Sequence, residues 1–159
     1  MGLSPARSAR TGRDAPVADP LVAYDDHELF LCIWFRAALA ARAEPVCADV
    51  VVDRVEPGPN EEWPEKLLVI RDDGTTDTSF ITGDVSVGMT VFAGSKENPK
   101  DAKDLARIVH ALASQIPSGD PDNPIAVLRE RNGPYMVPES QPRARIYSNV
   151  VFGTTARAL

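Results

Sequence analysis

Apolar residues recur at helical spacing in two segments of the chain. Between Asp25 and Arg42, large apolar side chains cover much more than half of the helix circumference, although a surface helix needs an apolar stripe only ~100° wide. Between Asn98 and Ile116, alanines, leucines and valines form a narrower stripe, which Pro117 ends. The pattern therefore predicts two helices, and the first has more apolar surface than one sheet needs.

Both predicted helices begin with sequence signals for a helix N-terminus. Asp25 followed by Glu28 forms a capping-box pattern, which puts two carboxylates near the positive end of the first helix. In the second helix, Asn98 is the expected N-cap, Pro99 suits the first helical position and Asp101 lies in the first turn.

Between the two helices, segments rich in β-branched residues predict strands. They cover Val46–Val55, Lys66–Arg71 and Val85–Ala93. In the last of these segments every second residue is apolar, which gives the strand one apolar face. Asp72-Asp73-Gly74 has the chemistry of a hairpin turn, so a short return strand is expected at Thr78–Thr82.

The end of the chain predicts two more strands, Ile125–Arg131 and Arg145–Phe152. Asn132-Gly133-Pro134 between them is a strong turn signal, because Gly tolerates positive φ while Pro fixes its own φ and lacks a donor. Tyr135 follows with a large apolar ring and a polar tip, a kind of side chain common at protein interfaces. No residue of this expected hairpin is suited to catalysis.

The elements follow the order α-β-β-(β)-β-α-β-β. This order predicts an α+β fold in which two helices pack on one face of a single mixed or antiparallel β-sheet. The chain has 159 residues, which suits a single domain, expected at residues 21–159. Residues 1–20 hold almost no large apolar side chain, so we expect an extended arm that cannot fold alone.

The N-terminal arm carries Arg7, Arg10 and Arg13 at a spacing of three. This spacing is compatible with phosphate contacts on nucleic acid, but Arg-bearing termini also dock on acidic protein surfaces, which is the favoured interpretation. The excess apolar surface of the first helix also has two explanations: it covers a neighbouring molecule, or the arm folds back over it.

The composition and net charge of the chain argue against several classes of function. A formal net charge of −6 and a pI near 4.9 argue against nucleic acid held over a broad surface. Cys32 and Cys47 are expected to be buried, inert thiols, with a disulfide as the alternative. The longest apolar run, Leu29–Phe35, is too short to span a bilayer and no signal peptide is visible, so we expect a soluble protein made in a cytoplasm.

A search for chemistry yields little. His27 and His110 lack metal-ligand spacing, and Asp72, Asp73 and Asp77 do not fit a calcium loop. No phosphate-binding loop or dinucleotide fingerprint occurs in the sequence. The sequence therefore predicts no catalytic residue, no cofactor and no metal.

One pattern near the end of the chain is moderately specific. It is a Gly-Pro-Tyr-x-Val-Pro-Glu element that begins at Gly133, followed by Pro142-Arg143-x-Arg145-x-Tyr147. Together with the order of the elements over Leu21–Gly153, this pattern resembles the tail terminator proteins of long-tailed phages that infect actinobacteria. The N-terminal arm is not part of the resemblance.

The resemblance implies a structural virion protein rather than an enzyme. Its expected form is a homo-hexameric ring on the head-proximal end of the tail tube, which ends tube polymerisation and joins the tail to the head connector or stopper protein. Genomic DNA passes only through the lumen, and an acidic lumen would keep phosphates from binding. The expected location is the neck of the virion, after synthesis in the cytoplasm of the host bacterium.

Such a function depends on surfaces, so contact residues are nominated by their chemistry. The expected contacts between subunits are Phe30, Trp34 and Phe35 on the first helix. The expected contacts with tube or connector are Trp63, Asp73, Asp77, Phe80, Tyr135, Arg143 and Arg145, and those of the arm are Arg7, Arg10 and Arg13.

Two alternatives remain from the sequence. A head completion or stopper protein also forms a ring in the neck but binds the portal side. A small α+β hydrolase or nucleotide-binding enzyme is the more distant alternative.

Overall fold

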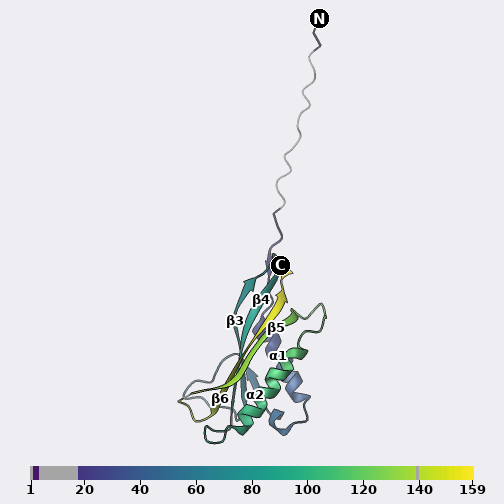
Figure 1. Ribbon diagram of the computed structural model, residues 1–159. Helices are drawn as coiled ribbons and strands as arrows, with labels where there is room; N and C mark the ends of the chain where they lie inside the picture. The colour runs from purple at the N-terminus through teal and green to yellow at the C-terminus, as the bar shows by residue number, and fades with distance from the viewer. Residues whose placement is uncertain (1, 4–17, 139) are drawn as a thin grey trace.

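Figure 1 shows a computed structural model of the protein, which describes residues 2–3, 18–138 and 140–159. Five strands form one long sheet in the order β2-β3-β4-β6-β5, and two helices, α1 and α2, cover the same face of it. β2 pairs with β3 in parallel, and the other pairs of this sheet are antiparallel. The predicted α+β fold is confirmed.

The elements in chain order are β1 (Val22–Ala23), α1 (His27–Ala40), the 3₁₀ helix η1 (Pro45–Cys47), β2 (Val51–Asp53), β3 (Leu67–Asp77), β4 (Thr82–Ala93), α2 (Lys100–Leu112), the 3₁₀ helix η2 (Ala113–Gln115), β5 (Ile125–Val137), β6 (Ala144–Thr155) and β7 (Arg157–Ala158). A second, two-stranded sheet pairs β1 with β7. Among the described residues, no helix is long and apolar enough to cross a membrane.

The core lies between the helices and one face of the sheet. Side chains alternate along β4, so that Val85, Val87 and Met89 point toward the helices and are buried. From α1, Phe35 is among the side chains that fill this core. The opposite face of the sheet carries a second, small apolar cluster around Phe92.

The starts of both helices differ slightly from the prediction. The N-cap of α1 is Asp26, whose Oδ1 accepts a hydrogen bond from the Leu29 amide at 2.9 Å. The carboxylate of Glu28 instead accepts from the Asp72 amide on β3, so the predicted capping box does not form. In α2 the N-cap position belongs to Pro99. Each helix therefore begins one residue later than the sequence signals suggested.

The predicted strand Val46–Val55 is mostly wrong. Pro45–Cys47 forms a 3₁₀ turn that buries Cys47, and only the three residues of β2 pair with β3. Asp49 between them has a φ of 57°, which is not extended backbone. Packing of the thiol into the core thus overrides the strand propensity of this Val-rich segment. Both cysteines are buried and free, as expected, and burial raises the pKa of each thiol.

The predicted hairpin turn at Asp72-Asp73-Gly74 is also wrong. β3 continues through this segment to Asp77, with a bulge between Asp72 and Thr75. Gly74 has a φ of 111°, and its amide donates to Oδ1 of Asp72, which is the local chemistry of a bulge as much as of a turn. The chain reverses at residues 78–81 instead, so no return strand forms at Thr78–Thr82.

Asn132-Gly133-Pro134 does not reverse the chain either. β5 runs through it, with a shift of register against β6 between Asn132 and Tyr135. Gly133 has a φ of 92°, and a Cβ there would stand 2.9 Å from the carbonyl oxygen of Tyr147. The glycine therefore serves a bulge with a close backbone approach. The reversal lies between Val137, where β5 ends, and Ala144, where β6 begins.

Candidate interaction surfaces

A buried histidine joins α1 to two strands. Nδ1 of His27 lies 3.2 Å from Oδ2 of Asp72 on β3, and its Nε2 lies 2.9 Å from Oγ1 of Thr154 on β6. His27 and Thr154 are each 2% exposed. A carboxylate, an imidazole and a hydroxyl in this order also make up the catalytic triad of hydrolases, so the arrangement bears on the enzyme alternative.

The hydroxyl of Thr154 is not arranged as a nucleophile. Its Oγ1 donates to the carbonyl oxygen of Pro124 at 2.9 Å, so Nε2 of His27 donates to Oγ1 rather than accepting from it. A general base must accept the proton of the nucleophile. The trio is therefore a structural latch, which we call the His27 latch.

The second histidine lies on the flank of α2 that faces β5. Nδ1 of His110 is buried without a hydrogen bond, and burial together with the nearby Arg131 guanidinium lowers the pKa of its imidazole. In the part of the chain that the structure describes, no group of three or more His, Cys, Asp or Glu side chains is placed to hold a metal ion.

One end of the sheet is built from the loop before β3 and the bend after β5. We call it the loop end. Trp63 packs edge-on against Phe92 with ring centroids 5.2 Å apart, and the guanidinium of Arg145 lies 5.4 Å from the centroid of the same ring. Arg145 also pairs with Glu56 at 3.5 Å.

Arg143 locks the two segments of the loop end together. Its Nη1 donates to the carbonyl oxygen of Glu65 at 2.6 Å, and its Nη2 donates to that of Trp63 at 3.2 Å. The planar fork of a guanidinium suits two carbonyls held side by side. Trp63, Arg143 and Arg145, which the sequence predicts as contact residues, therefore lie together and hold one another in place.

The opposite end of the sheet exposes apolar side chains. We call it the hairpin end, because it contains the β3–β4 turn. Phe80 and Ile81 in this turn are 55% and 50% exposed, and Leu21 and Leu159 are exposed beside β1 and β7. Backbone hydrogen bonds from Ala156 to Ile81 and from Leu159 to Leu21 link these segments.

Asp77, another predicted contact, lies at the hairpin end close to Phe80 and accepts a hydrogen bond from the Tyr24 hydroxyl at 2.7 Å. That bond raises the pKa of Tyr24. β4 spans the sheet between the two ends with 12 residues, or roughly 35–40 Å. Five of the seven residues predicted to meet tube or connector thus divide between two distant ends of the sheet (Figure 1).

The face of the sheet away from the helices carries the remaining two predicted contacts. Asp73 on β3 is paired with Arg71 at 2.6 Å. Tyr135 on β5 is half exposed and packs edge-on against Tyr147, with ring centroids 5.6 Å apart. Gly88 lies between the two sites, and a Cβ there would meet both the Tyr147 hydroxyl and the Asp73 carboxylate.

The predicted subunit contacts on α1 need correction. Phe35 is 0% exposed and belongs to the core, so it cannot touch another subunit. Phe30 and Trp34 are partly buried against the core, and Trp34 meets Phe35 edge-on at 5.1 Å. The large apolar side chains that α1 does expose are Leu29 and Ile33.

Sequence reasoning missed Leu29 and Ile33, although a signal was present. They lie one turn apart, on the stripe that also holds the N-cap Asp26 and Arg36. The aromatic residues of α1 were predicted as subunit contacts because aromatic side chains are frequent at interfaces. Large rings, however, are also the side chains that fill a core.

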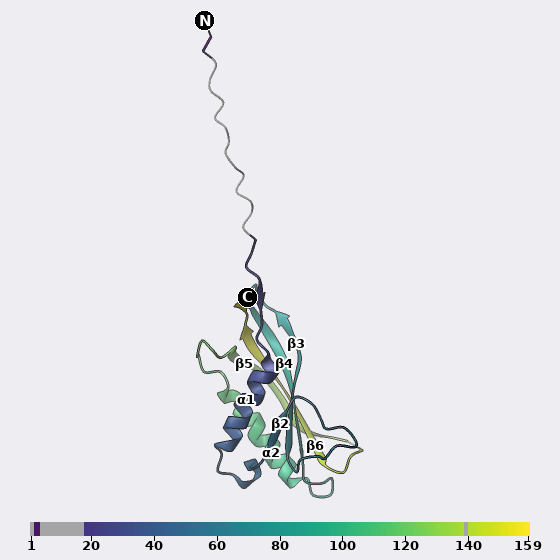
Figure 2. The same ribbon diagram turned by 180° about the vertical axis from the view of Figure 1, so that it is seen from behind.

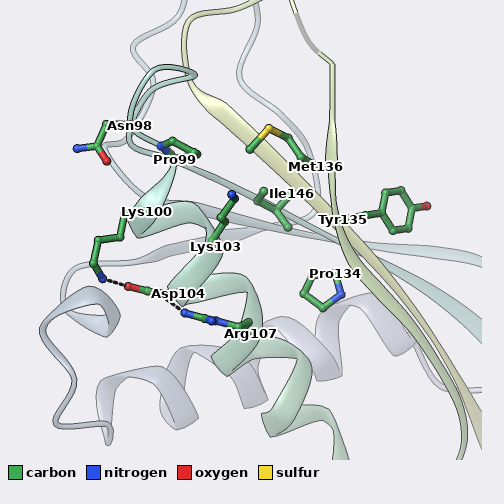
Figure 3. Close-up of a pocket in the computed structure, with 10 residues that line it drawn as sticks. All are labelled: Asn98, Pro99, Lys100, Lys103, Asp104, Arg107, Pro134, Tyr135, Met136 and Ile146. Carbon is green, nitrogen blue, oxygen red and sulfur yellow. Dashed lines mark hydrogen bonds and ion pairs between the residues drawn. The ribbon is translucent and has the colours of Figure 1, made fainter.

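A groove of about 650 Å³ lies between α2 and β5 (Figure 3). We call it the α2–β5 groove. Pro134, Met136 and Ile146 form its apolar floor, with Lys103 and Arg107 on the α2 side. The ring of Tyr135 points away from α2, toward the other face of the sheet.

The predicted arm contacts Arg7, Arg10 and Arg13 lie outside the described residues. No protein-family model matches this chain, and no curated protein shows significant sequence similarity to it.

Proposed function

We propose that the protein is a structural subunit of a hexameric ring that caps the head-proximal end of a phage tail tube. In this role the ring ends tube polymerisation, binds the head connector or stopper protein, and lets genomic DNA pass through its lumen. The resemblance of the Gly133 to Tyr147 segment to tail terminators motivates the proposal.

The observation that carries the proposal is the difference between the two ends of the sheet. A ring that joins a tube to a connector must present unlike surfaces to its two axial neighbours, and the side away from the tube must not accept another tube subunit. The hairpin end offers exposed apolar side chains such as Phe80, whereas the loop end is charged and locked by Arg143. Two such ends on one subunit suit stacking between different partners.

Electron microscopy of virions assembled without this protein tests the proposal. Tail tubes of uncontrolled length, separate from DNA-filled heads, are the expected result. Heads that leak DNA beside tails of normal length would contradict the tube-capping role and support a stopper protein. Normal virions would contradict any role in the neck.

A further inference from the structure

The two lateral sides of the sheet differ as clearly as its two ends. One side is formed by α1 and the short edge strand β2, and the other by α2 and the long edge strand β5. Figure 1 shows α2 and β5 toward the viewer, and the reverse view in Figure 2 shows α1 in front. A subunit of a closed ring needs two unlike lateral sides that fit each other.

The α1 side exposes an apolar stripe. Leu29 is 47% and Ile33 is 56% exposed. The stripe faces the β2 edge, because its two flanking residues both bind there: Asp26 pairs with Arg54 at 3.4 Å, and Arg36 donates to the Val52 carbonyl oxygen at 2.8 Å. Leu29 and Ile33 are one turn apart, roughly 6 Å, so together they form a ridge.

The α1 side is also acidic. Residues 25–56 hold seven acidic and three basic side chains. All three basic residues already have partners: Arg36 binds the Val52 carbonyl, Arg42 pairs with Glu44, and Arg54 pairs with Asp26. Asp25 and Glu56 pair with Arg157 and Arg145 from outside this segment. Asp49 and Asp53 have no ion-pair partner among the described residues, so this side keeps a net negative charge.

The α2–β5 groove has the opposite character. Four charged side chains line it, and three of them are cations: Lys100, Lys103 and Arg107. Asp104 pairs with both Lys100 and Arg107, which lower the pKa of its carboxyl group. The Lys103 ammonium has no ion pair among the described residues. Met136 on the floor is 45% exposed, so the groove offers apolar surface beside a free positive charge.

The ridge and the groove lie at the same height along the sheet. Arg36 binds Val52, which stands opposite Leu68 on β3. The same row of paired residues across the sheet continues through Val91 on β4 to Ile146 on β6 and Met136 on β5. Ile33 is three residues before Arg36, only ~4.5 Å along the helix axis. A rotation about an axis parallel to the strands therefore brings one side onto the other with little axial shift, which favours a closed ring over a helical filament.

We propose that the Leu29–Ile33 ridge of one copy packs into the α2–β5 groove of the next copy. The inference rests on the proposed ring, and it names the lateral contact that closes it. Leu29 and Ile33 cover Met136 and Pro134, and Lys103 faces the acidic α1 side of the neighbour. The occupant of the groove is thus a second copy of this chain.

Cross-linking of the full-length chain tests this contact. Ile33→Cys and Met136→Cys are combined in one chain, and the protein is oxidised mildly; Cys32 and Cys47 are buried and do not compete. The expected product is a ladder of covalent multimers that ends at a closed ring of six. The control combines Ile33→Cys with Val127→Cys, which is an exposed site on the same strand far from the groove, and it gives no ladder.

Two single variants test this lateral contact independently of whether the protein forms a ring. Ile33→Asp and Met136→Asp are each expected to weaken self-association roughly tenfold or more in sedimentation. Their melting temperatures should equal that of the wild type at dilutions where the wild type is also monomeric. An equal mixture of the two forms a heterodimer, because one intact ridge and one intact groove remain. A wild type that forms rings, together with a double-cysteine protein that gives no cross-linked multimers and Asp variants that both still assemble, would refute the proposed contact but not the proposed ring. A wild type that stays monomeric at every concentration and gives no ladder would overturn both.

Discussion

The loop end and the hairpin end of the sheet are stabilised in different ways. At the loop end, Arg143 and Trp63 bind neighbouring segments of the same chain through carbonyl and ring contacts. At the hairpin end, Phe80 and Ile81 are half exposed, and backbone hydrogen bonds together with small polar contacts such as Tyr24 to Asp77 tie the segments together. Large side chains therefore stabilise the fold at the loop end, whereas at the hairpin end they stay exposed and available to a partner.

The largest expected effect concerns the His27 latch, which fastens α1 to the half of the sheet that leads to the hairpin end. His27→Ala leaves the Asp72 carboxylate and the Thr154 hydroxyl without the imidazole and opens a cavity. We expect a loss of ~2–4 kcal/mol in the free energy of unfolding. Urea unfolding measures the loss, with His110→Ala as the control, for which we expect under ~1 kcal/mol. Equal losses for both variants would show that the His27 latch contributes no more to the free energy of unfolding than His110 does.

The next effect concerns the loop end. Arg143→Ala removes the two bonds to the carbonyl oxygens of Glu65 and Trp63, and we expect a loss of ~1–3 kcal/mol in the free energy of unfolding. Arg143→Lys should recover only part of this, because a single ammonium cannot reproduce the fork. Arg129→Ala is the matched control, since Arg129 forms an exposed pair with Asp84, worth under ~1 kcal/mol. An Arg143→Ala variant as stable as the wild type would remove the distinction between the two ends.

A smaller effect concerns the pH dependence of stability. The pKa of His110 is lowered from its ordinary 6.5 by burial and by Arg131. At His110 the unfolded chain therefore takes up a proton before the folded chain does, so the contribution of this residue to stability falls as the pH drops below about 6.5. Melting temperatures between pH 7.5 and 5.5 should fall less for His110→Gln than for the wild type. Parallel curves for the two proteins would contradict this cause.

The smallest expected change in stability is at the hairpin end. Phe80→Ser combined with Ile81→Ser should alter the free energy of unfolding by no more than ~0.5 kcal/mol, because both side chains are half exposed. The same variant should fail to dock on its axial partner in a co-sedimentation assay. A marked fall in melting temperature would mean that these residues serve the fold as Trp63 and Arg143 do.

Sequence patterns predicted the architecture well, because burial on one face imposes clear periods on β4 and α2. They failed where turn chemistry was involved. Asp72-Asp73-Gly74 and Asn132-Gly133-Pro134 were expected to reverse the chain, yet both form bulges inside long strands. Gly with positive φ serves either purpose, and only pairing with β4 or β6 decides between them.

The candidate surfaces were predicted less completely. Composition pointed to α1, but the large apolar side chains that it exposes are Leu29 and Ile33, and Phe35 is buried. The stripe that Leu29 and Ile33 share with Asp26 and Arg36 was a local signal, but how much of it the sheet leaves uncovered depends on the tilt of α1 over β2 and β3. The pairing of Arg143 with carbonyls 78 and 80 residues away in the sequence is equally a result of the whole fold.

The most direct test of the central claim is the growth of tail tubes in the presence of the purified protein, followed by electron microscopy. The account predicts that tube growth stops and that one six-fold ring sits on a single end of each tube. Tubes that keep growing at an unchanged rate, or that carry the protein along their walls, would contradict it.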